Sequence, residues 1–550
     1  MLNFSSVMTN SFSSPRSQKI AVAIFFILLL LTGIFIYRDF GLTCDEPLDR
    51  NTAAANLKYI LSIFASEDFA RSFIPNYDRI VPLESFVDRD YGVTFHLPAY
   101  LIELIFYKGQ FAEAFKARHL LNFLYVYAGL VALYAGCSSI FRSRLFGIAA
   151  VVLFLLFPRI FAESFYNGKD LIVVAFACMN LYTLSALLQK FSFKNVLLHA
   201  LSTALIVDTR IIGLAFLATG CGIIAVRGIL RGEIAKLFLK EAVYIFLSFA
   251  LIVCFFPYLW ADPLGRTAEV FANMAAFRHD GIILFEGNFV NIHALPKAYV
   301  PVWLGITLPP FLLAGFGSGV MIFLCKLLKN CHRTFIGFAD QKLTLFVLFN
   351  LVIFFGSSLS VFVLHSTLYN GWRQLYFIYP SLIVLNLYAL YFVLHVKKGR
   401  TLRLICTVAL ALYIAGALSS CIFIICNHPY QNVYFNILAK KPWTQYYDVD
   451  YWGNATHLAY ENILKREQGT VRYCHESMIF RANREGLPPH EIDRLVRVPC
   501  SLAQYRINNF FGRDPDDYLR LQKLKGERVF ELKAAGETVL EVIEGPASNK

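Results

Sequence analysis

The sequence is poor in charged residues, which make up only 16% of its 550 positions, whereas 57% of the positions are hydrophobic. Its mean hydropathy is +0.53. Soluble domains carry about a quarter charged residues, and they cannot bury this much apolar surface. The composition therefore excludes a soluble globular protein and predicts a polytopic membrane protein.

Several familiar signals are also missing. The twelve cysteines form no C-x-x-C pair and no Cys/His spacing typical of a metal site. No repeat of solenoid period is present. No small-residue cleavage site follows the first apolar segment, so we expect that segment to be an uncleaved anchor. Cys474 and Cys500 lie in the polar C-terminal part, where a disulfide can form in an oxidising compartment; their spacing alone leaves that pairing open.

Long apolar segments recur along the chain, and eleven of them are predicted as membrane spans because their lengths match a bilayer core. The predicted spans are 20–37, 118–141, 145–161, 171–188, 193–209, 211–226, 241–258, 300–325, 343–364, 374–395 and 402–426.

The positive charges lie on one side of this predicted topology. The short loops of that side, together with Arg16 and Lys19, hold eighteen Lys or Arg residues and two acidic residues. The opposite loop 38–95 holds six Lys or Arg residues and ten acidic residues. Excess Lys and Arg in short loops marks the cytoplasmic face, so we expect the N-terminus inside and the C-terminus outside.

The predicted organisation has three parts: a cytoplasmic tail (1–19), a transmembrane domain (20–426) with a long first outer loop (38–117), and an extracytoplasmic α+β tail (427–550). Within the outer loop, the apolar stretch 95–109 is short for a span and is typical of a helix in the membrane interface. The tail closes with ERVFELKAAGETVLEVIEG, whose alternating pattern around a glycine predicts a β-hairpin. The stretch LAYENILKREQG before it predicts a helix that Gly469 ends.

Unusual polar residues gather at the outer ends of the predicted spans. They are Asp45, Glu46, Glu163, Lys169, Asp170, Asp208, Arg210, His365 and Arg373. Charged groups at the membrane edge are costly unless they pair or serve a site. We therefore predict a cleft at the outer membrane surface that carries out group transfer.

Such a cleft has the groups needed to act on a lipid-linked donor. Lys169, Arg210 and Arg373 could hold the donor phosphate as it becomes the leaving group, because guanidinium and ammonium groups bind phosphate oxygens. Asp45 or Glu46 could accept the proton of the attacking hydroxyl.

Each of these residues also has a purely structural interpretation. The DEP sequence resembles a helix start. The Lys169–Asp170 pair could cap the next span, where the helix dipole favours an aspartate. Arg210 could pair with Asp208, and Arg373 could extend to the membrane surface.

Six segments, in order, resemble bacterial membrane glycosyltransferases of the GT-C class, relatives of the protein O-mannosyltransferases and of the lipid A aminoarabinose transferases. The segments are DEP, SFYNGKDLIVVAF (164–176), DTRIIGL (208–214), LPKAYVPVWLGITLPP (295–310), YNGWRQLYFIYP (369–380) and HPYQNVYFN…DVDYWG (428–453). This chain has Gly168 where many relatives have proline, and Gln374 where histidine is common.

The resemblance implies an inverting transferase with an outer-face site and a polyprenyl-phosphate-sugar donor. It implies that Asp45 is the base, assisted by Glu46, and that Lys169 and Arg373, with Arg210, lie near the donor phosphate. Glu163, Asp170 and His365 are expected to support them. Some GT-C enzymes use a divalent metal and others do not, so the metal is left open.

We therefore predict a glycosyltransferase of the bacterial inner membrane that acts on a protein, lipid A or another surface glycan. We expect it to bind membrane lipids and no nucleic acid. Two alternatives remain: a transporter or flippase of lipid-linked sugars, and a non-catalytic scaffold. A transporter needs polar residues along its whole path, whereas the polar set here lies at one end.

Overall fold

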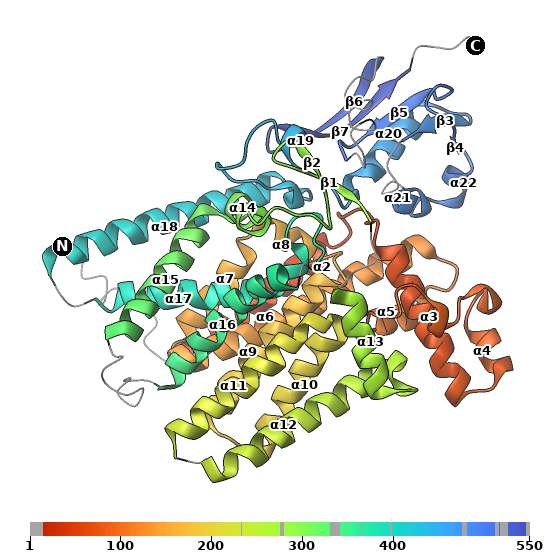
Figure 1. Ribbon diagram of the computed structural model, residues 1–550. Helices are drawn as coiled ribbons and strands as arrows, with labels where there is room; N and C mark the ends of the chain where they lie inside the picture. Colours follow the sequence, from red (N-terminus) through yellow and green to blue (C-terminus); the bar gives the residue numbers. More distant parts are fainter. Residues whose placement is uncertain are drawn as a thin grey trace.

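The computed structural model describes residues 15–232, 234–275, 280–329, 341–364, 366–396, 399–475, 481–511, 516 and 526–545. A bundle of long helices makes up most of the protein, and a smaller α+β domain, drawn in blue, lies at one end of that bundle (Figure 1). The predicted fold class is confirmed: a helical polytopic membrane protein with a small C-terminal α+β domain.

Within the described ranges, nine helices are long and apolar enough to cross a membrane. They are α2 (Pro15–Ile36), α6 (Phe111–Phe141), α9 (Asp170–Gln189), η3 (Ile211–Gly213) with α11 (Leu214–Leu230), α12 (Ile234–Phe255), α15 (Pro310–Lys329), α16 (Gln341–Val363), η6 (Arg373–Ile378) with α17 (Tyr379–Leu394), and α18 (Arg400–Cys426).

Helices also occur at the other two predicted positions, so each of the eleven predicted spans coincides with a helix. The two helices outside the nine are shorter: α7 (Arg144–Leu155) has 12 residues and α10 (Phe193–Thr209) has 17. Pro158, which begins the separate short helix α8 (Pro158–Glu163), divides the predicted segment 145–161 because proline cannot continue an established helix.

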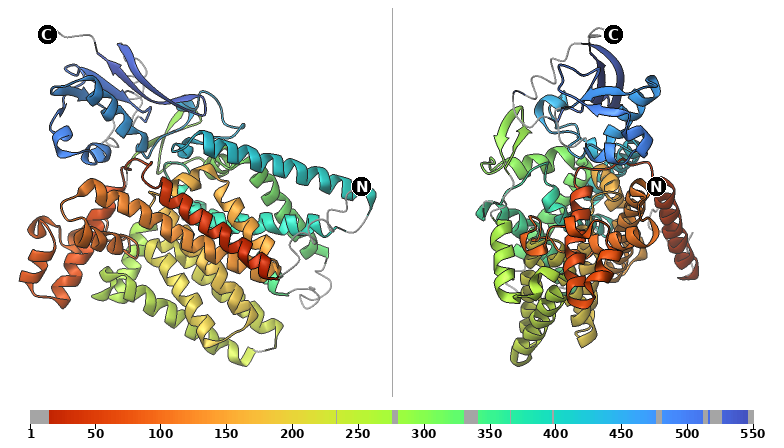
Figure 2. Two further views of the ribbon diagram at one scale, coloured as in Figure 1. Left: turned by 180° about the vertical axis from the view of Figure 1, so that it is seen from behind. Right: turned by 90° about the vertical axis from the view of Figure 1, so that its right-hand side faces the viewer.

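Exposed side chains distinguish the outer helices of the bundle from the central one. Phe35 of α2 is 86% exposed and Leu412 of α18 is 69% exposed, as expected of side chains that face lipid. In the central helix α9, by contrast, 83% of an 18-residue apolar stretch is buried, and its neighbours include α6 and α10. Figure 2 shows α2 lying along the outside of the bundle, in red.

Several shorter elements link the spans on the side of the α+β domain. They are α3 (Glu46–Phe64), α4 (Glu67–Phe73), η1 (Tyr77–Arg79), η2 (Leu83–Ser85), α5 (His96–Phe106), η4 (Pro257–Trp260), α13 (Pro263–Ala275), the hairpin β1 (Ile282–Phe285) and β2 (Asn288–Asn291), α14 (Tyr299–Thr307), η7 (Gln431–Val433), α19 (Trp443–Tyr446) and η8 (Asn454–Thr456). Helix α5 corresponds to the helix predicted within 95–109.

The C-terminal domain is a five-stranded sheet in the order β4-β3-β5-β7-β6, with α20 (His457–Arg466) packed against it. Its strands are β3 (Val471–Cys474), β4 (Leu495–Arg497), β5 (Tyr505–Asn508), β6 (Glu527–Ala534) and β7 (Glu537–Glu544), and its short helices are α21 (Arg481–Glu485) and α22 (Pro489–Ile492). The antiparallel pairing of β6 with β7 confirms the predicted hairpin, and α20 confirms the predicted helix.

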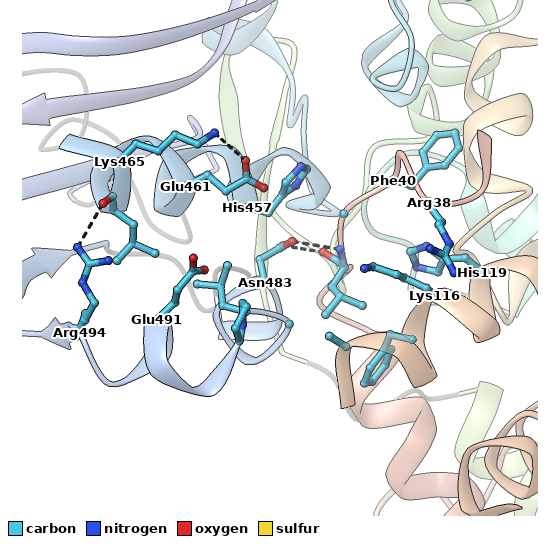
Figure 3. A pocket seen from close by; sticks show the side chains of 18 residues that line it. Arg38, Phe40, Lys116, His119, His457, Glu461, Lys465, Asn483, Glu491 and Arg494 are labelled. Atoms are coloured by element: carbon cyan, nitrogen blue, oxygen red, sulfur yellow. Dashed lines mark hydrogen bonds and ion pairs between the residues drawn. The ribbon is translucent and has the colours of Figure 1, made fainter. Parts of the chain in front are cut away.

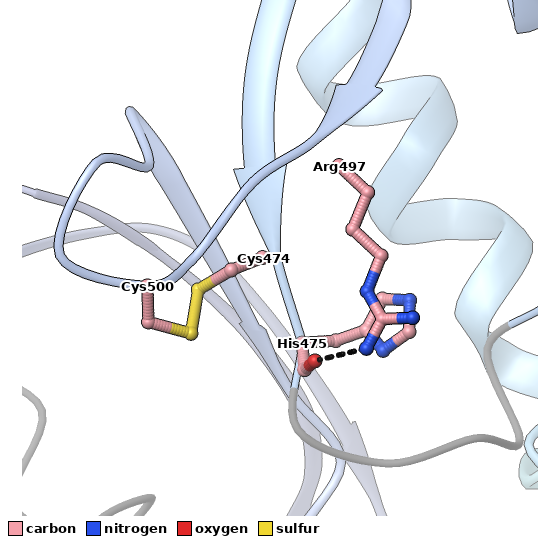
Figure 4. The surroundings of a disulfide bond; sticks show 4 residues. All are labelled: Cys474, His475, Arg497 and Cys500. Atoms are coloured by element: carbon pink, nitrogen blue, oxygen red, sulfur yellow. Dashed lines mark hydrogen bonds between the residues drawn. A yellow bond between two sulfur atoms is a disulfide. The ribbon is translucent and has the colours of Figure 1, made fainter.

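Cys474 and Cys500 form a disulfide at the end of β3, with Cα atoms 5.1 Å apart (Figure 4). Beside it, the Arg497 guanidinium donates to the backbone carbonyl of His475 at 3.3 Å. The bond ties the segment after β4 to β3, the neighbouring strand of the sheet.

Candidate functional site

The DEP sequence is a helix start, as its composition predicts. Asp45 directly precedes α3, and Pro47 lies in the first helical turn, where its missing N–H costs no hydrogen bond. The backbone carbonyl of Asp45 accepts from the N–H of Asp49 at 2.9 Å, so the two carboxylates are one helical turn apart. Residues four positions apart lie on the same face of a helix, so both carboxylates can reach one site.

The start of α9 carries a second aspartate to the same place. Asp170 is the first residue of the central helix, and its N–H donates to the side-chain oxygen of Asn167 at 2.8 Å. That contact satisfies one of the N–H groups that every helix start leaves without a partner. Lys169 therefore does not cap the helix through its side chain, which instead reaches Asp49.

Three cations from three separate segments meet these three carboxylates. The ammonium of Lys169 lies 2.6 Å from the Asp49 carboxylate, and the Nη1 atom of Arg373 lies 2.9 Å from Asp45 and 4.0 Å from Asp170. Arg210 pairs with Asp170. We call the six residues Asp45, Asp49, Lys169, Asp170, Arg210 and Arg373 the ion-pair cluster.

The ion-pair cluster is neither fully buried nor freely exposed. The side chain of Asp45 keeps 25% of its accessible surface, that of Arg210 16% and that of Lys169 13%. The Nε atoms of Arg210 and Arg373 are buried and have no hydrogen-bond partner within the part of the chain that the structure describes. The cluster therefore has donors to spare and a side open to a ligand.

Aromatic rings close the other side of the cluster. The Arg373 guanidinium lies 4.5 Å from the ring centre of Trp452 and 5.0 Å from that of Tyr369, and the Lys169 ammonium lies 4.6 Å from that of Tyr91. Cations over aromatic faces are stabilised by the ring quadrupole. These rings hold the two cations in place while excluding water from one side.

The charges of the cluster set the ionisation of its carboxylates. Burial on its own would raise the pKa of Asp45, but Arg373 and Lys169 outweigh it and lower that pKa to about 2. For Asp49 burial prevails over the attraction of Lys169, and its pKa rises to about 6. The pKa of Lys169 is raised, because Asp49 and Asp45 together outweigh its burial. Asp45 is therefore ionised at neutral pH.

Two of the predicted acidic residues lie beside the cluster and not in it. Glu46 accepts from the backbone N–H of Thr43 at 2.8 Å and lies 2.9 Å from Nε2 of His119. Glu163 accepts from Tyr376 at 3.0 Å and from Asn167 at 2.8 Å, and burial raises its pKa to about 7. Both carboxylates are fully buried, so they hold the surrounding segments. His365 lies outside the described residues.

Arg210 and Asp208 do not form the pair that their spacing suggested. Asp208 accepts from both the backbone N–H and the hydroxyl of Thr94, and its carbonyl accepts from Gly92. A side chain at Gly92 would collide with Asp208, which explains the glycine. Asp208 thus fastens the part of the first outer loop just before α5 to the end of α10, which leaves Arg210 for Asp170.

Sequence reasoning missed Asp49 and Trp452. A signal for Asp49 was present in DEPLD, because an aspartate four residues after Asp45 in a helix faces the same way. Trp452 offered no such signal, since its contact with Arg373 joins segments 79 residues apart through the fold.

The C-terminal domain fixes the loop that carries Asp45. The Asn483 side chain accepts from the N–H of Leu42 at 3.0 Å and donates to the carbonyl of Leu42 at 2.6 Å. The N–H of Cys44 donates to the carbonyl of Trp452 at 3.2 Å. Gly41 packs directly on Asn454 and His457, where no side chain would fit. The position of Asp45 therefore depends on residues more than 400 positions away.

No three His, Cys, Asp or Glu side chains within the described ranges come together as a metal-ligand set. The ion-pair cluster itself presents alternating positive and negative groups at the ends of separate helices. A phosphate could exchange with a carboxylate as partner of a cation there, and a freed carboxylate could take a proton.

Two crystal structures match the fold over most of its length. One is ArnT from Cupriavidus metallidurans bound to undecaprenyl phosphate, and the other is ArnT from the same organism in the apo state. Each is 13% identical to this chain, with a TM-score of 0.45, and covers 96% of it; the matches span 98% and 99% of the two ArnT chains. No protein-family model and no curated protein matches the sequence.

Proposed function

We propose that the protein is an inverting glycosyltransferase that moves a sugar from a polyprenyl-phosphate donor to an extracytoplasmic acceptor. The observation that carries this proposal is that three cations from three segments meet three carboxylates at one place. Lys169 meets Asp49, Arg210 meets Asp170, and Arg373 meets Asp45. The donor would be a polyprenyl-phosphate monosaccharide, and the acceptor a protein, lipid A or another surface glycan.

The cations supply the binding site for the donor phosphate. Each one is held by a carboxylate and, for Lys169 and Arg373, by an aromatic ring, so their positions are fixed before a ligand arrives. The buried Nε donors of Arg210 and Arg373 add hydrogen bonds for phosphate oxygens. Preplaced donors of this kind stabilise the charge that grows on the leaving phosphate.

Asp45 supplies the base. The acceptor hydroxyl oxygen attacks the anomeric carbon from the face opposite the phosphate, and the bond between that carbon and the phosphate oxygen breaks. Its electron pair leaves with the polyprenyl phosphate, and the hydroxyl proton passes to the Asp45 carboxylate. A phosphate that binds Arg373 and Lys169 offsets the charges that lower the pKa of Asp45, so the carboxylate becomes more basic once the donor is bound.

The other acidic residues of the site position these groups. Asp170 orients Arg210 and Arg373, and Asp49 orients Lys169. Glu46 and Glu163 hold the start of α3 and the end of α8 through buried hydrogen bonds. We place the site on the outer face of a bacterial inner membrane, with the N-terminus cytoplasmic and the C-terminal domain outside, from the distribution of Lys and Arg between the loops.

The test is transfer by the purified protein in lipid nanodiscs with a panel of radiolabelled polyprenyl-phosphate sugars. Release of free polyprenyl phosphate in the presence of an acceptor, with and without a chelator, is the readout. We expect release with one donor, and loss of that release in Lys169→Met.

The matched control is Lys440→Met, which removes a lysine whose side chain is 57% exposed and which lies outside the cluster. It should transfer like the wild type. Absence of both binding and release for every donor would refute the phosphate site, while tight binding of a donor without release to any acceptor would favour a flippase.

A further inference from the structure

A polar pocket lies beside the segment Phe40–Leu42, which precedes Asp45. It has a volume of about 510 Å³ and lies between the membrane domain and the C-terminal domain. In Figure 3, Arg38, Lys116 and His119 form one wall, and Glu461, Lys465, Glu491 and Arg494 form the other. This volume is within the range of small-molecule sites, and none of the residues of the ion-pair cluster lines the pocket.

One wall presents a buried group without a partner. His119 is 1% exposed, and its Nε2 lies 2.9 Å from the carboxylate of Glu46. Its other ring nitrogen, Nδ1, is buried and has no hydrogen-bond partner within the described part of the chain. Since a buried polar atom without a partner is costly, a ligand that bonds to Nδ1 is favoured.

The charges of the pocket indicate the chemistry of that ligand. The walls contribute four Lys or Arg residues and two Glu residues. Lys465 lies 3.5 Å from Glu461, and Lys116 is paired with Glu113 at 2.8 Å, so neighbouring carboxylates position both lysines. Cations suit a phosphate or carboxylate group, whereas the glutamates and His119 accept hydrogen bonds from hydroxyl groups. Leu42 and Phe115 give the pocket an apolar patch.

We propose that this pocket binds an anionic saccharide, a sugar carrying a phosphate or carboxylate group, at a site separate from the ion-pair cluster. Its hydroxyls bond to Glu461, Glu491 or His119, and its anionic group is held by Lys116 and Lys465. Because His119 also holds Glu46, which begins α3 next to Asp45, His119 acts as a positioning residue that couples the pocket to that helix start.

The first experiment is titration calorimetry on the full-length protein in phosphatidylcholine nanodiscs, with glucose 1-phosphate, glucose and inorganic phosphate as probes. We expect glucose 1-phosphate to bind at least tenfold more tightly than either part alone. The Lys116→Ala/Lys465→Ala variant should weaken its binding at least tenfold, whereas Lys533→Ala, an exposed lysine on β6, should not. Equal binding by wild type and double variant, or no binding by the wild type, would overturn the proposal.

A second readout follows His119 itself. In protein labelled with ¹⁵N-histidine, its ring signal is identified by its absence in His119→Gln. Glucose 1-phosphate should shift that signal in the wild type and leave it unchanged in the double variant. A signal that stays unchanged in the wild type while the sugar binds would refute the role of His119. Both experiments omit the polyprenyl donor, so failure of the proposed transferase activity leaves their outcome unaffected.

The source of the sugar is distinguished by competition. In nanodiscs that contain lipid A, a lipid-borne phosphosugar that occupies the pocket should lower the apparent affinity for glucose 1-phosphate. Unchanged affinity would assign the pocket to soluble anionic sugars. Equal competition by phosphatidylglycerol, which lacks a sugar, would overturn the saccharide assignment.

Discussion

Two groups of polar side chains among the described residues differ in charge and in the backbone that carries them. The ion-pair cluster holds full charges on segments just outside or at the first turn of helices. A second group lies within α9, α10 and α12 and contains only neutral partners, joined by short side-chain contacts. Its members are Asn180, Thr183, His199, Ser202, Thr203 and Tyr244, and we call it the hydroxyl network.

The difference indicates which group is built to change partners. In the hydroxyl network Thr203 lies 2.9 Å from the hydroxyl of Tyr244 and accepts from Asn180 at 3.0 Å, and all three residues belong to regular helices. Such contacts join helices within a membrane. The charges of the cluster, in contrast, lie just outside helices or in their first turn, and 13–25% of three of the side chains remains accessible. A ligand can reach the cluster, and the network serves helix packing.

The largest effect should come from Asp45→Asn. The amide keeps the size of the side chain but cannot take a proton, so transfer should fall roughly 10²- to 10⁴-fold, as for loss of a general base. The measurement is the rate of polyprenyl phosphate release under saturating donor. Binding of polyprenyl phosphate should persist, because the cations remain. Transfer at the wild-type rate would show that another residue is the base. The ion-pair cluster would then no longer differ from the hydroxyl network in function.

Arg210→Gln should weaken the binding of undecaprenyl phosphate about 10- to 100-fold, since a hydrogen bond to a charged group contributes about 1.5–3 kcal/mol. Asp170 keeps Arg373 nearby at 4.0 Å, so the fold should survive. The dissociation constant and the melting temperature are measured together. A lower melting temperature with an unchanged dissociation constant would make Arg210 a structural residue.

Glu163→Gln should change how the stability of the protein depends on pH. The pKa of Glu163 is raised to about 7, above that of an exposed glutamate near 4.3. Its contribution to stability is fully present below about pH 4.3 and is lost as the pH rises through 7. Between pH 5 and 8 the melting temperature of the wild type should therefore fall.

The fall should be smaller in Glu163→Gln, since glutamine does not titrate. A residual slope of the same sign is expected from Asp49, whose pKa is raised to about 6. Identical slopes in variant and wild type would show that Glu163 ionises in the folded protein as it does in the unfolded chain.

Thr203→Val should have the smallest effect. It removes the hydroxyl that contacts Tyr244 and should lower the free energy of unfolding by about 0.6 kcal/mol, a typical value for hydrogen bonds between membrane helices. Transfer should be unchanged. A large loss of transfer with a small loss of stability would show that the network takes part in function, and the comparison would fail.

Much of the fold could be predicted from local patterns. Helices occur at all the predicted spans because continuous apolar segments must satisfy their backbone groups internally in a bilayer. The hairpin 527–545 was predicted from two runs of alternating pattern around Gly536. The break before Pro158, inside the predicted span 145–161, was not predicted, because hydropathy does not report where a helix breaks.

The candidate site was predictable in part from the ends of the apolar segments. Span boundaries place Lys169, Arg210 and Arg373 at one level of the membrane, but they do not say which carboxylate each cation meets. The partner of Arg210 is Asp170, because Asp208 is held by Thr94 of the first outer loop. Such choices depend on segments brought together by the tertiary fold, and single-sequence spacing does not contain them.

The hydrogen bonds of Asn483 to Leu42 also set an order of events during biosynthesis. Leu42 is made among the first tenth of the chain, and Asn483 is 441 positions later. While the ribosome is still at work, the loop with Asp45 lacks this restraint, and the site is incomplete. A nascent or truncated chain that ends before Asn483 thus has its membrane helices but not its finished site, and the chain reaches its working geometry only near the completion of its synthesis.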